Sequence, residues 1–260
     1  MERSSMSKSR VIKLSPAAGV DMADEWYEFA TPDHFWMQWR FGQIWNAPAV
    51  REQALSPWLD IGCGHGQVIS QFESVGDYII DGCDLNLMAL EQAGEVRGNI
   101  YVYNIFDANP AMVGKYTGIL LLDVIEHIDD EGAFLEACLK HLQPSGLVVI
   151  NVPALQSLFS RYDEVAGHKR RYTKKMLRAL FENHGIQPME ISYWGMSLLP
   201  IALIRKFFLL FVSRKNIIRK GFRPPGSIIN SLFKVLMKLE MTLFKHPPLG
   251  TSILAVGRKN

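Results

Sequence analysis

The chain has 260 residues, of which 48% are hydrophobic and 21% are charged, so its composition excludes an intrinsically disordered or fibrous protein. Its formal net charge of +2 hides an asymmetry, because residues 1–160 hold 9 Lys or Arg against 21 Asp or Glu, whereas residues 161–260 hold 19 against 5. The length suits one large domain, or one domain with an elaboration, and the basic second half predicts an anionic partner.

Cysteine usage and hydropathy exclude further classes of protein. Cys63, Cys83 and Cys138 lie in predicted core elements without a C-x-x-C pair, which argues against a disulfide scaffold or a zinc module. Residues 1–13 are polar and basic and show no secretory signal. No uncharged apolar run reaches the length of about 18 residues that is needed to span a bilayer. We therefore expect a cytoplasmic protein.

The predicted elements begin with a loose leader over residues 1–20 and a tryptophan-rich, helical stretch over residues 21–51. From residue 58 onward, short apolar runs alternate with segments of helical periodicity. Strands are predicted at 58–63, 78–84, 99–106, 118–124, 146–152, 186–194 and 251–257. Helices are predicted at 67–75, 87–97, 132–142 and 174–184, and a polar, basic loop at 161–173. This alternation predicts an α/β fold whose doubly wound, mostly parallel sheet has seven strands.

A glycine-rich loop follows the first of these strands. Asp60, Gly62, Gly64 and Gly66 form a D-x-G-x-G-x-G motif before a predicted helix, where small residues let the backbone approach a ligand closely. The dinucleotide fingerprint G-x-G-x-x-G would need its third glycine at Gln67. The acid before the first glycine instead favours a ligand with a cationic portion near Asp60.

This loop and the segments after it resemble the class I S-adenosylmethionine-dependent methyltransferases, over residues 34–195 and 251–257. The resemblance implies a Rossmann-like fold and S-adenosylmethionine as the cofactor. It also implies cofactor contacts from the glycine loop and from the ends of the next three strands: Asp60, Gly62, Cys63, Gly64, Gly66, Asp84, Leu85, Asp107, Asp123 and Val124. A lone glycine loop is also compatible with a simple tight turn, and residues 107–110 fit an ordinary turn as well.

The turn after the fourth strand offers the first candidate catalytic group. Ligands of doubly wound sheets bind at the carboxyl ends of the strands, so His127, which follows Glu126 there, is placed to line a pocket. Methyl transfer to a hydroxyl benefits from a general base, and His127 is one hypothesis for that base. The alternative is that His127 caps the following segment or packs on the cofactor.

A second candidate lies in residues 162–172, after the fifth strand. This segment resembles a D-E-x-x-G-H-x-R-R-Y signature of a methyltransferase subgroup from bacterial cell-surface glycan and lipid-linked sugar pathways. His168 is the other hypothesis for the base, alone or together with Asp163. The residues predicted to bind the acceptor include paired arginines, which suit a phosphate or carboxylate: Arg170, Arg171 and Tyr172. The alternative is a solvated basic loop.

Two regions outside the core are expected to flank the pocket. His34 and Trp36 belong to an H-F-W stretch similar to one in the same subgroup; they are predicted to bind the acceptor from a helical lid, with aromatic packing at the sheet edge as the alternative. Residues 196–247 form an apolar and basic insertion before the last strand. This insertion is predicted to meet an anionic membrane surface, with a helical cap or a homodimer interface as alternatives.

The sequence therefore predicts a leader and helical lid at 1–50, a cofactor-binding core at 51–195, the insertion at 196–247, and a last strand with a tail at 248–260. We expect a methyltransferase that O-methylates a sugar or lipid-linked glycan precursor at the cytoplasmic membrane face. The alternatives are an isoprenoid quinone C- or O-methyltransferase and a non-catalytic, cofactor-binding scaffold or membrane adaptor. We predict no metal site and, since the basic half has no recognition motif, no nucleic-acid partner. The oligomeric state stays open.

Overall fold

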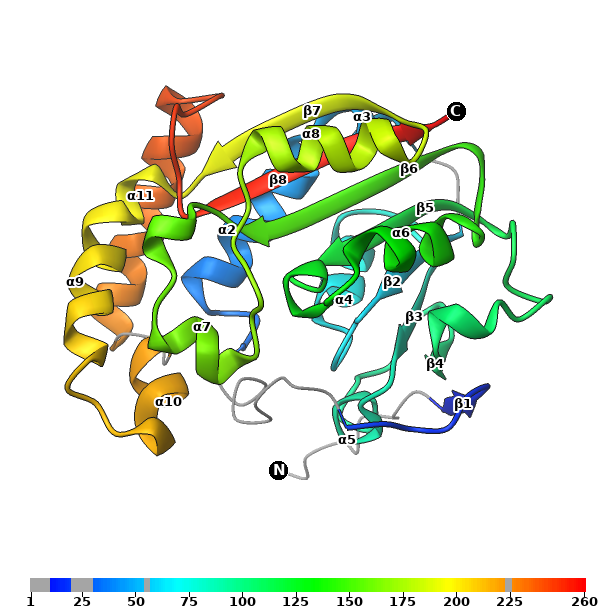
Figure 1. Cartoon of the computed structure of the whole chain (residues 1–260), viewed down its shortest axis with the longest axis horizontal. Helices are drawn as coiled ribbons and strands as arrows, with labels where there is room; N and C mark the ends of the chain where they lie inside the picture. Colours follow the sequence, from blue (N-terminus) through cyan, green and yellow to red (C-terminus); the bar gives the residue numbers. More distant parts are fainter. Residues whose placement is uncertain (1–9, 20–29, 54–56, 223–225) are drawn as a thin grey trace, which may run out of the picture.

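The computed structural model describes residues 10–19, 30–53, 57–222 and 226–260. Within this part of the chain, eight strands form one sheet in the order β1-β4-β3-β2-β5-β6-β8-β7 (Figure 1). The strands are β1 (Val11–Lys13), β2 (Trp58–Ile61), β3 (Ile80–Asp84), β4 (Ile100–Val102), β5 (Tyr116–Leu122), β6 (Leu142–Pro153), β7 (Ile186–Trp194) and β8 (Ser252–Lys259). β1 to β6 run parallel, and β8 is antiparallel to both β6 and β7. This confirms the predicted α/β fold with a mostly parallel sheet.

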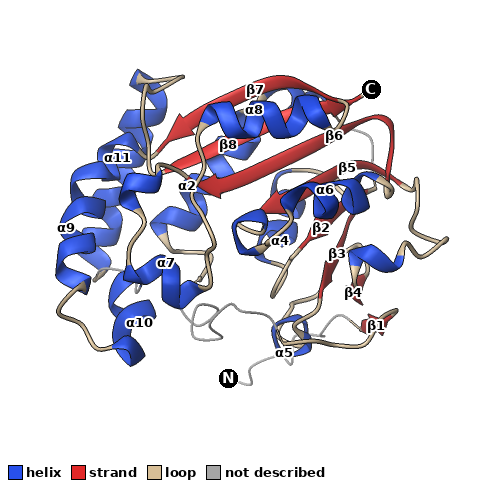
Figure 2. Ribbon diagram, viewed as in Figure 1, coloured by secondary structure: helices blue, strands red, loops and turns tan. Residues whose placement is uncertain are grey.

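Helices connect and cover these strands (Figure 2). They are α2 (Phe35–Asn46), α3 (Pro48–Glu52), α4 (Gln67–Val75), α5 (Leu87–Leu90), α6 (Glu131–Leu139), α7 (Arg161–Ala166), α8 (Lys174–Asn183), α9 (Leu199–Leu209), α10 (Ile217–Phe222) and α11 (Ser227–Leu243). Short 3₁₀ turns lie between them, among them η1 (Ile105–Asp107), η2 (Ile125–His127) and η4 (Met196–Leu198). None of the helices that the structure describes has both the length and the apolar character needed to cross a membrane.

Apolar side chains pack on both faces of the sheet. Along β5, Ile119 and Leu121 pack in a cluster with α6 and α8, whereas Leu120 and Leu122 pack with α2, α3 and α4. Successive side chains of a strand point to opposite faces, so the two clusters lie on opposite sides of the sheet. Burial on both faces explains why β5 is apolar almost throughout.

The N-terminal part differs from the prediction. Residues 11–13, expected in a loose leader, form β1, which pairs with β4 and adds an eighth strand at the sheet edge. Three residues are too few to show a periodicity, so the pattern could not reveal this strand. The helical stretch predicted over 21–51 is found as α2 and α3, while residues 20–29 lie outside the described residues.

Two further assignments also differ. The helix predicted at 87–97 ends at Leu90. The polar loop predicted at 161–173 begins with α7, because Ser160 and Asp163 form a capping box: the Ser160 hydroxyl accepts from the backbone at the start of α7, and the Ser160 N–H donates to Asp163. A helix of six residues is too short for its periodicity to stand out from a loop.

The insertion leaves the sheet at Trp194 and returns at Ser252, two residues that pair with each other across β7 and β8. Its helices α9, α10 and α11 lie together at one end of the molecule, on the left of Figure 1. Glu240 of α11 anchors the insertion, since its carboxylate accepts the backbone N–H groups of Gly195, Met196 and Ser197 at 2.7–2.9 Å. The turn that begins the insertion is therefore fixed by a side chain from near its end.

Candidate active site

A cavity of about 480 Å³ lies at the carboxyl ends of β2, β5 and β6. Its walls come from the glycine loop, from α2, from the segment around α7, and from the insertion. The predicted site residues that line it are His34, Trp36, Asp60, Gly62, Cys63, Gly64, Asp123, His127, His168 and Arg171. The predicted site residues outside its lining are Gly66, Asp84, Leu85, Asp107, Val124, Asp163, Arg170 and Tyr172. One cavity thus joins candidate groups from distant parts of the sequence.

The glycine loop has the backbone that its sequence requires. Gly62, Gly64 and Gly66 all have positive φ angles, of 77°, 53° and 75°. A Cβ atom on Gly62 would lie 2.6 Å from the side chain of Val124, so only glycine fits at this contact between β2 and β5. Gly66 then caps the start of α4. The loop therefore brings bare backbone to the cavity wall.

Asp60 is a buried carboxylate at the edge of the cavity. Only 3% of the residue is exposed, and it lines the cavity next to the glycine loop. Burial raises the pKa of Asp60 to about 7, although the positive charge of Arg40 opposes the shift. A buried carboxyl that ionises near neutral pH fits a cationic ligand group, which is what the methionine part of S-adenosylmethionine provides.

The acids after β3 and β4 lie beyond this cavity. Both carboxylate oxygens of Asp84 accept backbone N–H groups at 2.9 Å, from Gly64 and Asn86, which fixes the carboxylate beside the glycine loop. Asp107 is exposed and accepts a hydrogen bond of 2.5 Å from the hydroxyl of Ser15. Leu85 is half-buried, and its carbonyl accepts the N–H of Ala18. The segment after β1 thus crosses the strand ends where the resemblance implies the nucleoside.

An ion pair that the sequence did not reveal closes the other side of the cavity. Arg40, the only charged residue of α2, places Nη1 2.7 Å from Oδ2 of Asp123. Asn151 donates to the other oxygen of Asp123 at 2.9 Å, and Trp194 donates to Asn151 at 2.9 Å. Asp123 itself has a positive φ of 60° at the end of β5. The one signal in the sequence was a single arginine within an aromatic helix.

His168 and Asp163 form a histidine–carboxylate pair whose carboxylate is fully buried. His168 Nδ1 lies 2.9 Å from Oδ1 of Asp163, and Arg171 donates two further hydrogen bonds to the same carboxylate, at 2.8 and 3.1 Å. Burial alone would raise the pKa of Asp163, but these hydrogen bonds and charges lower it to about 2. An ionised Asp163 holds the proton on Nδ1, so Nε2 of His168 is left as a proton acceptor.

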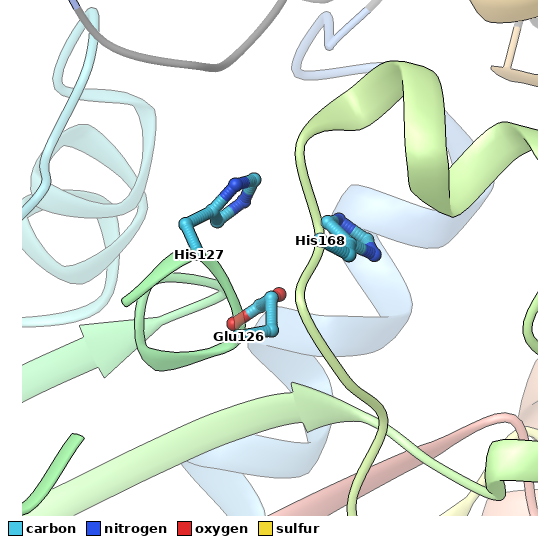
Figure 3. A group of neighbouring side chains, drawn as sticks. All are labelled: Glu126, His127 and His168. Atoms are coloured by element: carbon cyan, nitrogen blue, oxygen red, sulfur yellow. The ribbon is translucent and has the colours of Figure 1, made fainter. Parts of the chain in front are cut away.

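His127 and Glu126 lie in the turn after β5, beside His168 (Figure 3). The rings of His127 and His168 meet edge to face, with centroids 4.8 Å apart. Burial, and to a smaller extent the positive charge of His168 when that ring is protonated, lower the pKa of His127 to about 4, so His127 is neutral at pH 7. Glu126 is fully buried, and neither its oxygens nor His127 Nε2 has a hydrogen-bond partner among the described residues.

The same three residues have the spacing of a possible cation site. One ligand atom from each of Glu126, His127 and His168 lies within 4.8 Å of the others. However, burial and the nearby Asp123 carboxylate raise the pKa of Glu126 well above its usual range, which favours a protonated, neutral side chain. The three residues therefore fit a neutral polar wall as well as they fit a cation site.

The other predicted acceptor residues have different environments. Arg170 pairs with Glu131 and donates to the carbonyl of Asp129, away from the cavity. Tyr172 is buried and donates to the carbonyl of Ile125. His34 caps α2 by accepting from the N–H of Trp36.

Two cations that the sequence did not place at the site come from the insertion: Arg205 and Lys220 line the cavity. Arg205 stacks over the ring of Tyr162 at 4.8 Å and donates to the carbonyl of Gly221. The insertion therefore supplies positive charge to the cavity wall.

Comparisons with known proteins identify the family. The family described as a methyltransferase domain matches residues 40–191, more than half of the chain. The chain is 29% identical over 121 residues to a ubiquinone biosynthesis O-methyltransferase of Caulobacter sp. (strain K31), covering 39% of this chain and 48% of that protein. It is also 29% identical over 164 residues to a protein of the same name from Parvibaculum lavamentivorans, covering 57% and 63%. The chain thus spans about half the length of the first of these relatives.

Among solved structures, a SAM-dependent methyltransferase from Archaeoglobus fulgidus has the same fold, with a TM-score of 0.53. The sequence identity is 19%, and the alignment covers 86% of this chain and 96% of that one. The family match, the glycine loop and the buried Asp60 agree with the fold and cofactor that the sequence predicted. The chain belongs to the S-adenosylmethionine-dependent methyltransferases of the methyltransferase-domain family, and its methyl donor is S-adenosylmethionine.

Proposed function

We propose that this methyltransferase O-methylates a hydroxyl group on the sugar of a lipid-linked glycan precursor, with His168 as the general base. The observation that carries the proposal is the contact of 2.9 Å between His168 Nδ1 and the ionised Asp163. When bound, S-adenosylmethionine supplies an electrophilic methyl group. His168 Nε2 accepts the proton of the acceptor hydroxyl, and Asp163 stabilises the imidazolium that results.

The proposed cofactor contacts follow the strand ends. Asp60 attracts the cationic methionine portion, while the glycine loop, with Cys63, presents its backbone to it. Asp84 accepts hydrogen bonds from the ribose hydroxyls, with Leu85 beside it. Asp107 accepts a hydrogen bond from the amino group of the adenine. Asp123, held by Arg40, lines the cavity near the methyl group, and Val124 follows it beside Gly62. These assignments rest on the resemblance. The burial of Asp60 supports its assignment as well, as do the hydrogen bonds that hold Asp84 and Asp123.

The chemistry of the cavity supports this class of acceptor. A sugar hydroxyl is a weak acid, so its methylation needs an oriented base such as the pair of His168 and Asp163. Arg205 and Lys220, which line the same cavity, suit the phosphate of a lipid-linked sugar. Apolar side chains of α9, such as Ile204 and Phe208, suit its hydrocarbon chain.

A second candidate acceptor is the phenolic hydroxyl of an isoprenoid quinone precursor. Its support is the name shared by the relatives reported above, whose matched segments cover 48% and 63% of their length. A phenol is a stronger acid than a sugar hydroxyl and needs less help from a base. The two candidates therefore differ in how strongly turnover depends on His168.

The experiment is an incubation of the full chain with methyl-tritiated S-adenosylmethionine and an extract of bacterial membrane lipids. Mild acid cleaves sugar–phosphate bonds, so label on a sugar passes into the aqueous phase, whereas label on a quinone ring stays in the organic phase. We expect acid-releasable label, reduced about 100-fold by His168→Ala. His184→Ala, which removes a histidine that caps α8, is the matched control. Label that stays in the organic phase would contradict the sugar acceptor and favour the quinone precursor.

A further inference from the structure

The outer side of the insertion exposes large apolar side chains. Of the residues in α9, only Leu209 is buried, although the helix is almost wholly apolar. The residues that define this α9–α11 surface, with their exposed fractions, are Ile204 (69%), Phe207 (64%), Phe211 (90%), Ile228 (84%), Leu232 (62%) and Leu243 (69%). Water-exposed apolar patches of this kind mark an interaction site in a folded protein.

The positive charge of the insertion indicates what kind of partner the α9–α11 surface binds. Residues 196–247 contain ten Lys or Arg and one acid, Glu240. Glu240 is buried, and its carboxylate already accepts backbone N–H groups at the start of the insertion. Exposed basic residues such as Arg214, Lys215 and Arg219 follow α9 directly. A second copy of the chain would bring like charges face to face, because the surface offers no acid to pair with them. An anionic lipid bilayer complements both the apolar side chains and the cations.

The surface is continuous with the active-site cavity. Ile204 and Phe208 are 69% and 50% exposed, and both also line the cavity, so the cavity wall and the outer surface share side chains. Lys220 lines the cavity as well and lies 5.9 Å from the ring centre of Phe208. An amphiphile could therefore pass from this surface to the cavity with its chain against α9 and its phosphate beside Lys220.

We propose that the α9–α11 surface docks on an anionic lipid bilayer and that the acceptor enters the cavity from the bilayer without passing through water. The first part concerns the surface alone, and the second part rests on the proposed function. Phe207 and Phe211 insert among the acyl chains, and the basic residues after α9 meet the anionic head groups. The acceptor keeps its hydrocarbon chain along α9 while its sugar reaches His168.

The test is flotation of the full chain with vesicles of phosphatidylcholine alone and of phosphatidylcholine with phosphatidylglycerol. We expect the wild type to float with the anionic vesicles only. In Phe207→Ser/Phe211→Ser, the fraction of protein that floats should fall about tenfold. Neither position lines the cavity. The matched control is Ile79→Ser/Val113→Ser, at positions 47% and 44% exposed elsewhere on the molecule, which should float as the wild type does. Calorimetry with S-adenosylmethionine should give the same affinity for all three proteins.

Three results would overturn the docking proposal. The first is wild-type protein that stays in solution with both kinds of vesicle. The second is equal flotation of the wild type and of Phe207→Ser/Phe211→Ser. The third is a dimer in sedimentation equilibrium that the double substitution dissociates, with no vesicle binding. Failure of the proposed function has a different signature, namely vesicle binding without acid-releasable label on a sugar.

Discussion

Arg40 and Asp123, 83 residues apart in the chain, form a nearly buried ion pair of 2.7 Å between α2 and the end of β5. The side chain of Arg40 is 5% exposed and that of Asp123 is 17% exposed. Burial raises the pKa of Asp123, and the adjacent guanidinium opposes this shift. The helix that the sequence suggested as a lid is therefore held by this ion pair at the edge of the sheet that borders the cavity.

Removal of this arginine should destabilise the fold. Arg40→Leu leaves Asp123 without its counter-ion, and a broken buried pair costs about 3–5 kcal/mol. Urea unfolding followed by tryptophan fluorescence measures the change. Arg51→Leu, at an exposed position of α3, is the control and should change the free energy of unfolding by less than about 0.5 kcal/mol. Equal effects of the two substitutions would contradict the role given to the ion pair.

Asp163 should act on turnover through His168 and not through acceptor binding. Asp163→Asn removes the charge that keeps the proton on Nδ1 of His168, so we expect kcat to fall about 10²- to 10⁴-fold while KM changes little. Nitrogen NMR of the His168 ring should show the loss of the single Nδ1–H tautomer. If the variant keeps the wild-type kcat although the tautomer of His168 has changed, Asp163 has no role in turnover.

Cofactor affinity should rise with pH because of Asp60. Burial raises its pKa to about 7, so the carboxyl is neutral below that pH and negative above it. A cationic ligand binds the ionised form better, so S-adenosylmethionine should bind about tenfold more tightly at pH 7.0 than at pH 5.5. Asp60→Asn should bind weakly with no such dependence, whereas the exposed Asp77→Asn should keep it. Calorimetry at both pH values measures the affinity for S-adenosylmethionine. If the affinity of Asp60→Asn changes with pH as that of the wild type does, the role given to Asp60 is wrong.

Chelation should leave turnover unchanged. The proposed reaction uses His168 as the base, and Glu126 has a raised pKa that favours its neutral form, so EDTA should alter kcat less than about twofold. Glu126→Gln should behave in the same way, since a protonated carboxyl and an amide have similar shape and no charge. Inhibition by EDTA that is reversed by a divalent cation would instead establish a metal site at Glu126, His127 and His168.

Elements with enough residues to show a period could be predicted from the sequence. The helix at 67–75 and the strand at 186–194 have the predicted bounds, and the helix α8 ends one residue earlier than predicted. β1 and α7 escaped prediction because each is too short for a pattern. Their positions depend on pairing with β4 and on a capping box, and the first of these contacts joins residues far apart in the chain.

The candidate site shows the same limit. Sequence motifs placed Asp60 and the glycine loop together, and a signature brought His168 near Asp163. Two neighbouring arginines could not be distinguished in the sequence, yet Arg171 lies against Asp163 while Arg170 pairs with Glu131 outside the cavity. A single arginine stands out in the aromatic helix, but no local pattern could identify Asp123 as its partner. That pair forms only when α2 packs on the sheet.

Trp194 and Ser252 pair as neighbours across a β-hairpin, although the whole insertion separates them in the chain. In geometric terms, the insertion is an enlarged hairpin loop whose two ends meet at one point and whose first turn is bound by Glu240. The entropy of closing a loop grows only with the logarithm of its length, so a loop at this position can be long or short with little effect on the sheet. The region for which we propose contact with the acceptor can therefore differ in length while the strand ends that carry the proposed cofactor contacts stay in place.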